Sequence, residues 1–403
     1  EQTPMQTVID RLAVKLVPTA LLIAIATFAI MMLSNFDLYT SINRAVTVLV
    51  VFCPCALFLS TPTAVMASIG QASKHGVIIK TFNALEKLAK VNKIAFDKTG
   101  TLTYGKLNVN DIENFSDFSD EKIMSLISSL ESKSEHPIAK SVTEYLDEKN
   151  IKKENVENFK MKIARGVEGE ILGNKYFCGN EKYFRENNIN VKDNIKEKIE
   201  KYSNEAKNII LFGDEKEVLS IVTLSDTLRE NAKEMVENLK SFEIEPLLLT
   251  GDNLLTAKYF SDKVGITEVK AELSPEEKFE NIKNLKENNV VCMIGDGIND
   301  APALKLADVS VAMGKTGSDI SIESANIVLM GHDVSKIVYL KKLANATVKT
   351  IKFNIIISLL INFVAVILSV LGVLNPLVGA IVHNLGSILV ILNASLLYDR
   401  KFN

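Results

Sequence analysis

The chain has 403 residues, of which 47% are hydrophobic and 24% are charged, with a formal net charge of -3 at pH 7. This apolar content excludes a disordered chain, and four Cys are too few for a disulfide-stabilised scaffold. The balanced charge gives no electrostatic reason to expect nucleic acid as a partner. The mean hydropathy of +0.15 averages over unlike parts, since apolar runs occupy both ends and a Lys/Glu-rich block fills the middle. We therefore expect a membrane protein with a large soluble insert.

Four apolar segments, residues 16–33, 45–70, 355–374 and 377–397, reach the length that crosses a hydrocarbon core of roughly 30 Å. A single run of this kind could be a buried core helix, but four runs in two pairs favour two transmembrane hairpins, residues 1–70 and 346–403. Lysines gather on the inner flanks of both pairs, at Lys74, Lys80, Lys87, Lys90, Lys93, Lys341, Lys342, Lys349 and Lys352. The positive-inside rule then places residues 71–350 in the cytoplasm. The thiols of Cys178 and Cys292 suit that reducing compartment.

The cytoplasmic block alternates between short apolar runs and helical stretches. Residues 93–96, 246–249 and 290–294 are predicted strands, and residues 231–241 and 275–287 are predicted helices. This rhythm is typical of an α/β fold, a parallel sheet with crossover helices, in which ligands bind beyond the carboxyl ends of the strands. We assign residues 71–107 and 209–345 to this domain. The Asn/Lys/Glu-rich stretch 108–208 is predicted to be a smaller inserted domain.

Polar motifs follow each predicted strand. The first strand leads into Asp97-Lys98-Thr99-Gly100-Thr101, where a carboxylate before a glycine turn rich in hydroxyls can act as a nucleophile toward a phosphoryl group. The second leads into Thr250-Gly251-Asp252, whose hydroxyl can hold a phosphoryl oxygen. Lys278, further along the chain, can neutralise charge on the transferring group.

The third strand leads into Gly295-Asp296-Gly297-Ile298-Asn299-Asp300. Two carboxylates four residues apart across a glycine turn offer hard oxygen ligands suited to Mg²⁺. Taken alone, Gly-Asp-Gly could be an ordinary turn. The presence of the other motifs in the same order favours a phosphoryl-transfer site.

Together these motifs resemble those of a P-type ATPase with a haloacid-dehalogenase-like phosphorylation domain. Cys53-Pro54-Cys55 and Ser134-Glu135-His136-Pro137 are similar to signatures of its heavy-metal (type IB) branch. The resemblance implies a haloacid-dehalogenase-like parallel sheet with an inserted α+β nucleotide domain, on an α-helical transmembrane bundle. It also implies ATP, Mg²⁺ and a transported heavy-metal ion. It gives catalytic roles to Asp97 as the acyl-phosphate, Lys98, Thr99, Thr250, Gly251, Asp252 and Lys278, and assigns Mg²⁺ to Asp97, Thr99, Asp296 and Asp300.

The resemblance also assigns the nucleotide pocket. His136 is expected at the adenine, with Glu135 and Pro137 setting its loop, although an isolated His beside Pro is more often a surface turn. The branch's glycine loop corresponds to residues 164–169, with Gly166 and Gly169 as its glycines and Asn180 as a further polar contact. Ala164 stands where the family usually has Gly. Because Ala adopts positive φ less readily, a slightly different loop is expected.

The membrane motif has its own physical basis. Pro54 interrupts the backbone hydrogen bonds in mid-span, which is tolerated where a helix faces protein or a cavity. Cys53 and Cys55 flank this break, and their thiolates would select soft or borderline ions such as Cu⁺, Zn²⁺ and Cd²⁺. The alternative is a pair of small buried thiols in a kinked helix.

The second hairpin supplies Asn362, His383 and Ser387 as further candidate ligands, because polar groups at membrane depth are costly and usually functional. By the family resemblance, Asn362 lies where zinc/cadmium exporters carry Lys and copper exporters carry Asn. His383 replaces the Asp of the first group and the Met of the second. An imidazole joined to two thiolates favours Zn²⁺ or Cd²⁺. A Cu⁺ exporter and a Mn, Co or Fe transporter remain alternatives.

The sequence contains no Thr-Gly-Glu, the loop with which the actuator domain of such pumps directs water onto the acyl-phosphate. We therefore expect the C-terminal half of a longer multi-pass pump of the bacterial cell membrane, partnered by an N-terminal half that holds the actuator and upstream helices. Membrane lipid and a soluble metallochaperone are further expected partners. A membrane-anchored phosphatase of the same superfamily is a rival, although Thr99 stands where such enzymes carry a second acid. A non-enzymatic partner subunit is the third alternative.

Overall fold

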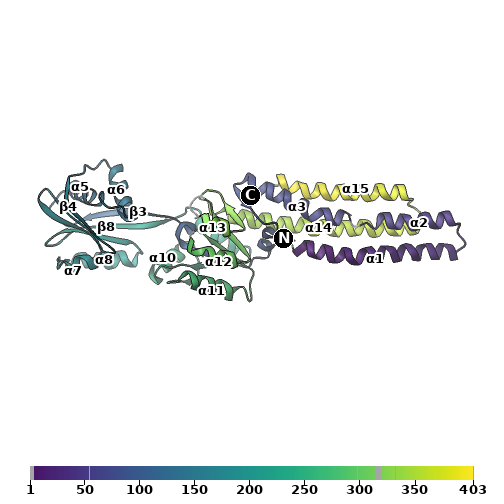
Figure 1. The fold of residues 1–403 in the computed structure, drawn as a ribbon, viewed down its shortest axis with the longest axis horizontal. Helices are drawn as coiled ribbons and strands as arrows, with labels where there is room; N and C mark the ends of the chain where they lie inside the picture. The colour runs from purple at the N-terminus through teal and green to yellow at the C-terminus, as the bar shows by residue number, and fades with distance from the viewer. Residues whose placement is uncertain (1–3, 54, 297, 315–318, 332, 403) are drawn as a thin grey trace.

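The computed structural model describes residues 4–53, 55–296, 298–314, 319–331 and 333–402, which form an elongated molecule (Figure 1). A helical bundle occupies one end, a domain built on a seven-stranded sheet lies in the middle, and a domain built on a six-stranded sheet lies at the other end. We call these the helical bundle, the central domain and the outer domain. Both ends of the chain lie near the junction of the bundle and the central domain.

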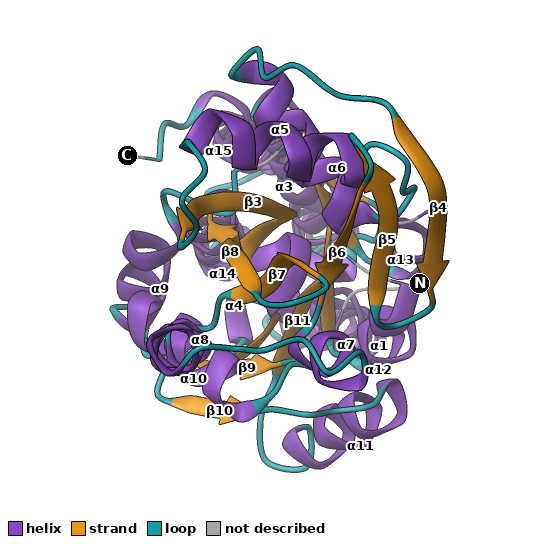
Figure 2. Cartoon of the chain, turned by 90° about the vertical axis from the view of Figure 1, so that its left-hand side faces the viewer, coloured by secondary structure: helices purple, strands orange, loops and turns teal. Residues whose placement is uncertain are grey.

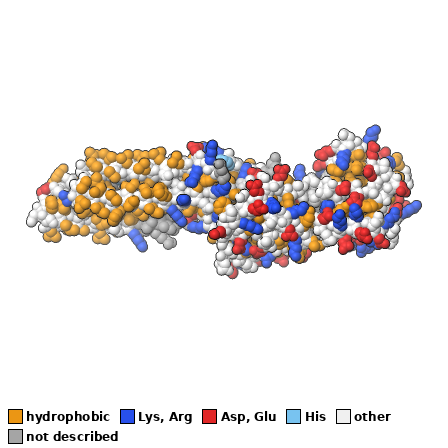
Figure 3. Space-filling model, turned by 180° about the vertical axis from the view of Figure 1, so that it is seen from behind, with side chains coloured by type: hydrophobic (Ala, Val, Ile, Leu, Met, Phe, Trp, Pro, Cys, Tyr) orange, Lys and Arg blue, Asp and Glu red, His pale blue; other side chains and the backbone are white. Residues whose placement is uncertain are grey.

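The helical bundle contains α1 (Pro4–Leu33), α2 (Leu38–Val51), α3 (Cys55–Lys74), α14 (Lys336–Val370) and α15 (Pro376–Ser395). Within the described part of the chain, three helical segments are long and apolar enough to cross a membrane: Val14–Leu33, Lys336–Val370 and Pro376–Asp399. Apolar side chains cover the visible face of the bundle, whereas charged side chains are scattered over the two other domains (Figure 3). This division confirms the expected membrane protein with a large soluble insert.

The second apolar segment differs from the single span predicted over residues 45–70. It forms two helices, since α2 ends at Val51 and α3 begins at Cys55. The segment between them contains Pro54, which lies outside the described residues. Proline has no backbone N–H and cannot continue a helical ladder, which is the physical reason for a break at this point in the sequence. A second proline, Pro62, lies inside α3.

The central domain has the predicted α/β architecture. Its strands are β1 (Val77–Ile79), β2 (Lys93–Asp97), β9 (Glu245–Leu249), β10 (Glu268–Lys270), β11 (Val291–Gly295), β12 (Val309–Met313) and β13 (Ile327–Leu329). They are arranged in the order β1-β13-β12-β11-β2-β9-β10, and all neighbours are parallel except β1 and β13. One face packs against α4 (Asn83–Lys90), α9 (Ala232–Lys240), α10 (Leu254–Val264) and the start of α14. The other packs against α11 (Pro275–Leu285) and α12 (Ala301–Leu306), with α13 (Asp319–Ser324) beyond.

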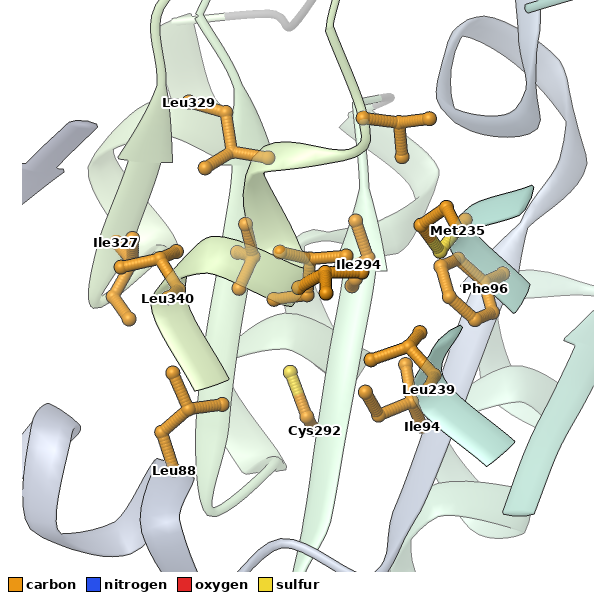
Figure 4. Close-up of a cluster of buried hydrophobic side chains, with 14 of the residues drawn as sticks. Leu88, Ile94, Phe96, Met235, Leu239, Cys292, Ile294, Ile327, Leu329 and Leu340 are labelled. Atoms are coloured by element: carbon orange, nitrogen blue, oxygen red, sulfur yellow. The ribbon is translucent and has the colours of Figure 1, made fainter. Parts of the chain in front are cut away.

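Every residue of β2, β11 and β12 is buried. Strands covered by helices on both faces need mostly apolar side chains, which explains the apolar middle of β2 and β11, while the buried Ser310 of β12 donates to Asn326. Figure 4 shows part of the resulting core, where Phe96 and Ile94 of β2 pack beside Met235 and Leu239 of α9. In this sheet β2 lies between β9 and β11, with Asp97 opposite Leu249. The residues that follow the three strands therefore meet at one edge.

The outer domain is an antiparallel sheet of β3 (Thr103–Asn114), β4 (Val156–Lys162), β5 (Gly166–Ile171), β6 (Asn174–Gly179), β7 (Asn208–Asp214) and β8 (Val218–Leu228), in the order β3-β8-β7-β6-β5-β4. Helices α5 (Asp120–Glu131) and α6 (Pro137–Glu148) cover one face, and α7 (Glu181–Glu186) and α8 (Asp193–Asn204) cover the other (Figure 2). The sheet extends beyond both boundaries of the stretch expected as the inserted domain, residues 108–208. The reason is that β3 and β8 pair with each other along their length and continue the sheet to β7.

Candidate functional site

Asp97 lies at the carboxyl end of β2 and is buried. The ammonium of Lys278 donates to Asp97 Oδ1 at 2.5 Å and to Asp300 Oδ1 at 2.7 Å, so it bridges the two carboxylates. Lys278 is held on the first turn of α11, which begins with a capping box between Ser274 and Glu277. The predicted nucleophile and the predicted charge-neutralising lysine are therefore in direct contact.

The electrostatics of this cluster reflect its burial. Burial, reinforced by the charge of Asp300, raises the pKa of Asp97 to about 7 against the opposing effect of Lys278. Burial also disfavours the ammonium of Lys278, yet Asp97 and Asp300 together hold the pKa of Lys278 above its ordinary value. Opposite charges at contact distance stabilise each other most where water is excluded. Lys278 therefore stays charged, and the Asp97 carboxylate is held near the point of protonation at neutral pH.

Three carboxylates converge at this edge. Oxygens of Asp97, Asp296 and Asp300 lie within 4.8 Å of one another. Glycines make room for them: a Cβ on Gly100, whose φ is +70°, would meet Asp296 Oδ2 at 1.5 Å, and a Cβ on Gly295 would lie 2.9 Å from Asp300 Oδ2. An all-oxygen set of this kind suits a hard divalent cation. The residues present therefore fit the Mg²⁺ that the sequence predicts.

The turns on either side carry the remaining predicted catalytic residues. The Lys98 ammonium pairs with Asp252 at 2.5 Å, which joins the turn after β2 to the turn after β9. Thr250 is buried, and its hydroxyl accepts a hydrogen bond from the Asp252 backbone N–H at 3.2 Å, while Gly251 is exposed between them. Thr99 is exposed and lines a cavity of about 390 Å³ together with Lys98 and Asp252.

Two residues of this site escaped the sequence analysis. Asp226, near the end of β8, accepts hydrogen bonds from Thr103 Oγ1 at 2.5 Å and from the Gly105 N–H at 3.1 Å. Arg229 is buried and donates to the backbone carbonyls of Thr101, at 2.7 Å, and Gly100. The two side chains therefore hold the turn that follows Asp97. The signal in the sequence is an Asp and an Arg three residues apart at the end of a long, largely apolar strand.

The outer domain contains a cavity of about 520 Å³ between the α5–α6 connection and the β4–β5 turn. His136, Gly166 and Asn180 line it, as the sequence predicts. Glu135, Pro137 and Gly169 are not among the described residues that line it. Glu135 is exposed, Pro137 begins α6, and a Cβ on Gly169 would meet Val156 of β4 at 2.8 Å. These three residues therefore affect the cavity through the shape of the loops around it and not by lining it.

Glu131, at the end of α5, is the acidic residue that lines the cavity. Burial raises the pKa of the Glu131 carboxyl against a hydrogen bond from the Cys178 thiol, which lines the same cavity. Glu131 was not predicted, and Glu135 was assigned through the family resemblance as a residue that sets the loop of His136. Glu131 lies in the last turn of α5, where every residue from Ser125 to Glu131 is buried, so it is an acidic side chain within an otherwise enclosed stretch of helix.

Ala164, which stands where the family resemblance gives Gly, has a left-handed conformation with a φ of +57°. Asn180 holds this loop by donating from Nδ2 to the Ala164 carbonyl at 3.0 Å. Its Oδ1 accepts from the Tyr183 N–H at 2.9 Å and caps α7. Ala164 therefore adopts positive φ despite its Cβ. Asn180 has a structural role in addition to lining the cavity.

In the helical bundle, Cys53, Cys55 and His383 bring their ligand atoms within 4.8 Å of one another, which joins the helix break to α15. The Cys53 and Cys55 sulfurs form a disulfide. The structure thus differs from the predicted pair of thiolates, because two Cys separated by one residue at a helix break bring their sulfurs into bonding range. Reduction of the pair would generate the thiolates. Cys178 and Cys292 are free and buried, as expected for the cytoplasmic block.

The other predicted ligands lie close to this cluster along the helices. Asn362 of α14 donates from Nδ2 to the Cys53 carbonyl at 3.4 Å, so it contacts a carbonyl at the helix break. The Ser387 hydroxyl donates to the His383 carbonyl one turn away in α15, at 3.1 Å. Asn362 is therefore placed as a support for the Cys53 backbone, and Ser387 as a local contact within its own helix.

Comparisons with known proteins agree with this geometry. Residues 92–308, more than half of the chain, match the family model described as haloacid dehalogenase-like hydrolase. A probable cadmium-transporting ATPase of Alkalihalophilus pseudofirmus is 37% identical over 97% of this chain and 55% of its own length. A copper-exporting P-type ATPase B of Archaeoglobus fulgidus is 35% identical over 97% of this chain and 57% of its own length. The chain thus spans about half the length of the curated relatives it matches.

Solved structures show the same relationship. A zinc-transporting PIB-type ATPase in an E2·Pi state superposes with a TM-score of 0.87 at 29% identity, over 95% of this chain and 62% of that one. The catalytic domain of a CPx-ATPase superposes with a TM-score of 0.54 at 34% identity, over 68% of this chain and 98% of that one. The predicted architecture, an α/β headpiece on transmembrane helices, is confirmed by these similarities. The chain belongs to the haloacid dehalogenase-like hydrolases and is similar, along its whole length, to heavy-metal P-type ATPases.

Proposed function

We propose that this chain forms the catalytic and transport half of an ATP-driven pump that exports a heavy-metal cation, with Zn²⁺ or Cd²⁺ as the preferred cargo. The observation that carries the proposal is that the described chain contains both a candidate phosphorylation site and a candidate site for the transported ion. A buried Asp97 contacts Lys278 at a sheet edge, and a cluster of Cys53, Cys55 and His383 lies in the helical bundle. Helix α14 runs from the core of the central domain into that bundle without interruption.

In the proposed reaction, an Asp97 oxygen attacks the γ-phosphorus of ATP, ADP leaves, and water later hydrolyses the acyl-phosphate. Lys278 fixes the rotation of the Asp97 carboxylate through Oδ1 and offers positive charge to the incoming phosphoryl group. The Lys98–Asp252 pair and Arg229 hold the surrounding turns in place. The 520 Å³ cavity lies in the outer domain and Asp97 lies in the central domain. The proposed reaction therefore includes a movement of the outer domain that brings the γ-phosphate of ATP to Asp97.

Mg²⁺ would be held by Asp97, Asp296 and Asp300, with Thr99 as the further residue that the family resemblance assigns. When bound, it supplies positive charge that offsets the repulsion between these carboxylates and the phosphate oxygens. The nucleotide would occupy the outer-domain cavity, with the base between Glu131 and His136 and the loop of Gly166 beside it. A buried carboxylate beside a base favours a ring that presents an amino donor.

The choice of cargo depends on the donor set. Two thiolates, formed after reduction of Cys53 and Cys55, and the imidazole of His383 match the tetrahedral N/S preference of Zn²⁺ and Cd²⁺. The relatives named as cadmium-transporting and the solved zinc transporter support this preference. Cu⁺ is the second candidate, because a relative of similar identity is named as copper-exporting and two sulfurs suffice for Cu⁺. The proposed partners are an N-terminal half with an actuator domain and upstream helices, membrane lipid and a soluble metallochaperone.

Incubation of the complete pump with γ-labelled ATP and Mg²⁺ tests the proposal. One acid-stable, hydroxylamine-sensitive phosphate should appear on the wild-type protein. Asp97→Asn should abolish it, because an amide is a far poorer nucleophile than a carboxylate. Asp117→Asn, at an exposed position of the outer domain, serves as the control and should label normally. Label that persists in Asp97→Asn would exclude the proposed reaction.

A further inference from the structure

Helix α14 connects the two sites through specific contacts along its length. It is one uninterrupted helix from Lys336 to Val370. Its membrane end carries Asn362, which contacts the Cys53 carbonyl. Its middle is bonded to α15 through Asn354, which accepts from Asn393 Nδ2 at 2.6 Å, and to α3 through a hydrogen bond of 2.7 Å between Thr347 and Ser68. A displacement of the Cys53 backbone would therefore act on α14, which is one continuous helix.

The opposite end of α14 is embedded in the core of the central domain. Leu340 packs in the same apolar cluster as Leu88 of α4 and Cys292 of β11, as Figure 4 shows. This cluster also contains Ile94 and Phe96 of β2, the strand that ends at Asp97. Apolar packing resists separation of the helix from the sheet, but it is non-directional and leaves sliding along the helix axis weakly opposed.

Lys341 adds a directional contact at this point. Its side chain is only 4% exposed, and its ammonium donates to the backbone carbonyls of Leu88, Ala89 and Val91 at 3.0, 2.9 and 3.0 Å. These carbonyls belong to the last turn of α4 and the residue after it, where helix-end carbonyls carry partial negative charge, and the Leu88 carbonyl also accepts from the Val91 N–H. A buried ammonium is tolerated only when its donors are satisfied. Lys341 is thus fixed to the end of α4.

The position of this contact in the chain gives it a consequence for catalysis. Val91 precedes β2 by two residues, and β2 ends at Asp97. Lys341 and Asn362 are 21 residues apart on α14, which corresponds to about 30 Å along a helix. Helix α14 therefore contacts the Cys53 backbone through Asn362 and the connection between α4 and β2 through Lys341.

Resting on the proposed function, we propose that Lys341 is a positioning residue that couples ion occupancy at the cysteine cluster to phosphorylation of Asp97. With Lys341 bound to the end of α4, a shift of α14 changes the placement of β2 and of the Asp97 carboxylate relative to Lys278. Without this contact, α14 can move along its axis while β2 remains in place. The central domain would then still phosphorylate Asp97, but phosphorylation would no longer depend on the transported ion.

The test uses the complete pump and separates coupling from chemistry. Phosphorylation of Asp97 by inorganic phosphate and Mg²⁺, without transported ion, measures the headpiece alone. Phosphorylation by ATP, with and without Zn²⁺ under reducing conditions, measures coupling. Lys341→Met should keep labelling by phosphate within about twofold and lower the ratio of Zn²⁺-stimulated to basal labelling by about tenfold. Lys341→Arg, which retains several donors, should restore part of that ratio.

Lys349→Met is the matched control, because Lys349 is an exposed lysine on the same helix, and its stimulation ratio should equal that of wild type. An unchanged ratio in Lys341→Met would overturn the proposal. Loss of labelling by phosphate in both Lys341→Met and Lys341→Gln would also overturn it, since the role would then be structural. If only Lys341→Met fails to fold, Lys341→Gln is judged by the same ratio. If Zn²⁺ gives no stimulation in the wild type, the same ratio is measured with Cd²⁺ and with Cu⁺, and absence of label that depends on any of the three ions would refute the proposed function itself.

Discussion

The phosphorylation site and the cysteine cluster are built by different means. Asp97 is held by a sheet edge, where Lys278 on another element bonds to it directly and Asp226 and Arg229 hold the turn behind it. The cysteine cluster depends on a helix break and on one residue from a neighbouring helix, and its sulfurs change character with oxidation. The first site is therefore set by the fold of one domain. The second is set by how separate helices pack, which allows its geometry to change during a transport cycle.

The cysteine cluster should show the largest mutational effect on ion response. Under reducing conditions, Cys53→Ser should abolish stimulation of ATP hydrolysis by Zn²⁺ or Cd²⁺ in the complete pump, because a hydroxyl does not replace a thiolate for these ions. His383→Ala should raise the concentration needed for half-maximal stimulation by about tenfold. Stimulation of the wild type should be stronger with Zn²⁺ or Cd²⁺ than with Cu⁺.

Asn384→Ala is the control for this series, since Asn384 is the exposed neighbour of His383 on α15. Strong stimulation by Cu⁺ that is unaffected by His383→Ala would reverse the choice of cargo. In that case His383 would be a packing residue between helices, and the two sulfurs would form the whole site.

The nucleotide cavity offers a sharper comparison between two glutamates. Glu131→Gln should raise KM for ATP by about tenfold with little change in kcat, because it replaces a buried carboxyl oxygen beside the base with an amide NH₂ that cannot accept a hydrogen bond. Glu135→Gln, at the exposed residue beside His136, should leave KM within about twofold of wild type. Steady-state hydrolysis across ATP concentrations measures both. Equal effects of the two substitutions would show that the cavity is not where the base binds.

The difference between a site set by one domain's fold and a site set by helix packing also explains which residues could be predicted from the sequence. Asp97, Asp296 and Asp300 were predicted because they follow strands, and the strand ends of a parallel sheet meet at one edge whatever the lengths of the connecting loops. Lys278, on α11, was predicted from its own motif. Glu131 was missed because its contribution depends on which side of α5 faces the cavity, a tertiary feature. The disulfide between Cys53 and Cys55 was missed because the sequence spacing is equally compatible with two thiolates and with a bonded pair.

Burial of Asp97 predicts a pH effect that is confined to the headpiece. Because the pKa of Asp97 is raised from 3.8 in an unfolded chain to about 7 when folded, stability that is present below pH about 4 is lost as pH rises to about 7. Asp97→Asn cannot ionise and escapes this loss. The thermal midpoint of Asp97→Asn should therefore gain on that of wild type between pH 5 and 7 and level off above, by a few degrees. A gap that stays constant with pH would contradict the burial argument.

The smallest expected effect concerns Ala164, at the rim of the nucleotide cavity. Its φ of +57° is unfavourable for any residue with a Cβ, and the hydrogen bond from Asn180 helps to hold it there. Ala164→Gly should raise the free energy of unfolding by about 1 kcal/mol, which is the relief of left-handed strain less the greater unfolded-state entropy of Gly. Leu172 has a φ of +50° in an exposed turn away from both cavities, so Leu172→Gly should give a similar gain. Only Ala164→Gly should alter KM for ATP, with a modest increase, because a more flexible loop is less well ordered for binding. Denaturant unfolding and ATP titration of both variants measure the two effects separately. An equal change of KM in both would mean that the Ala164 loop does not contact the nucleotide.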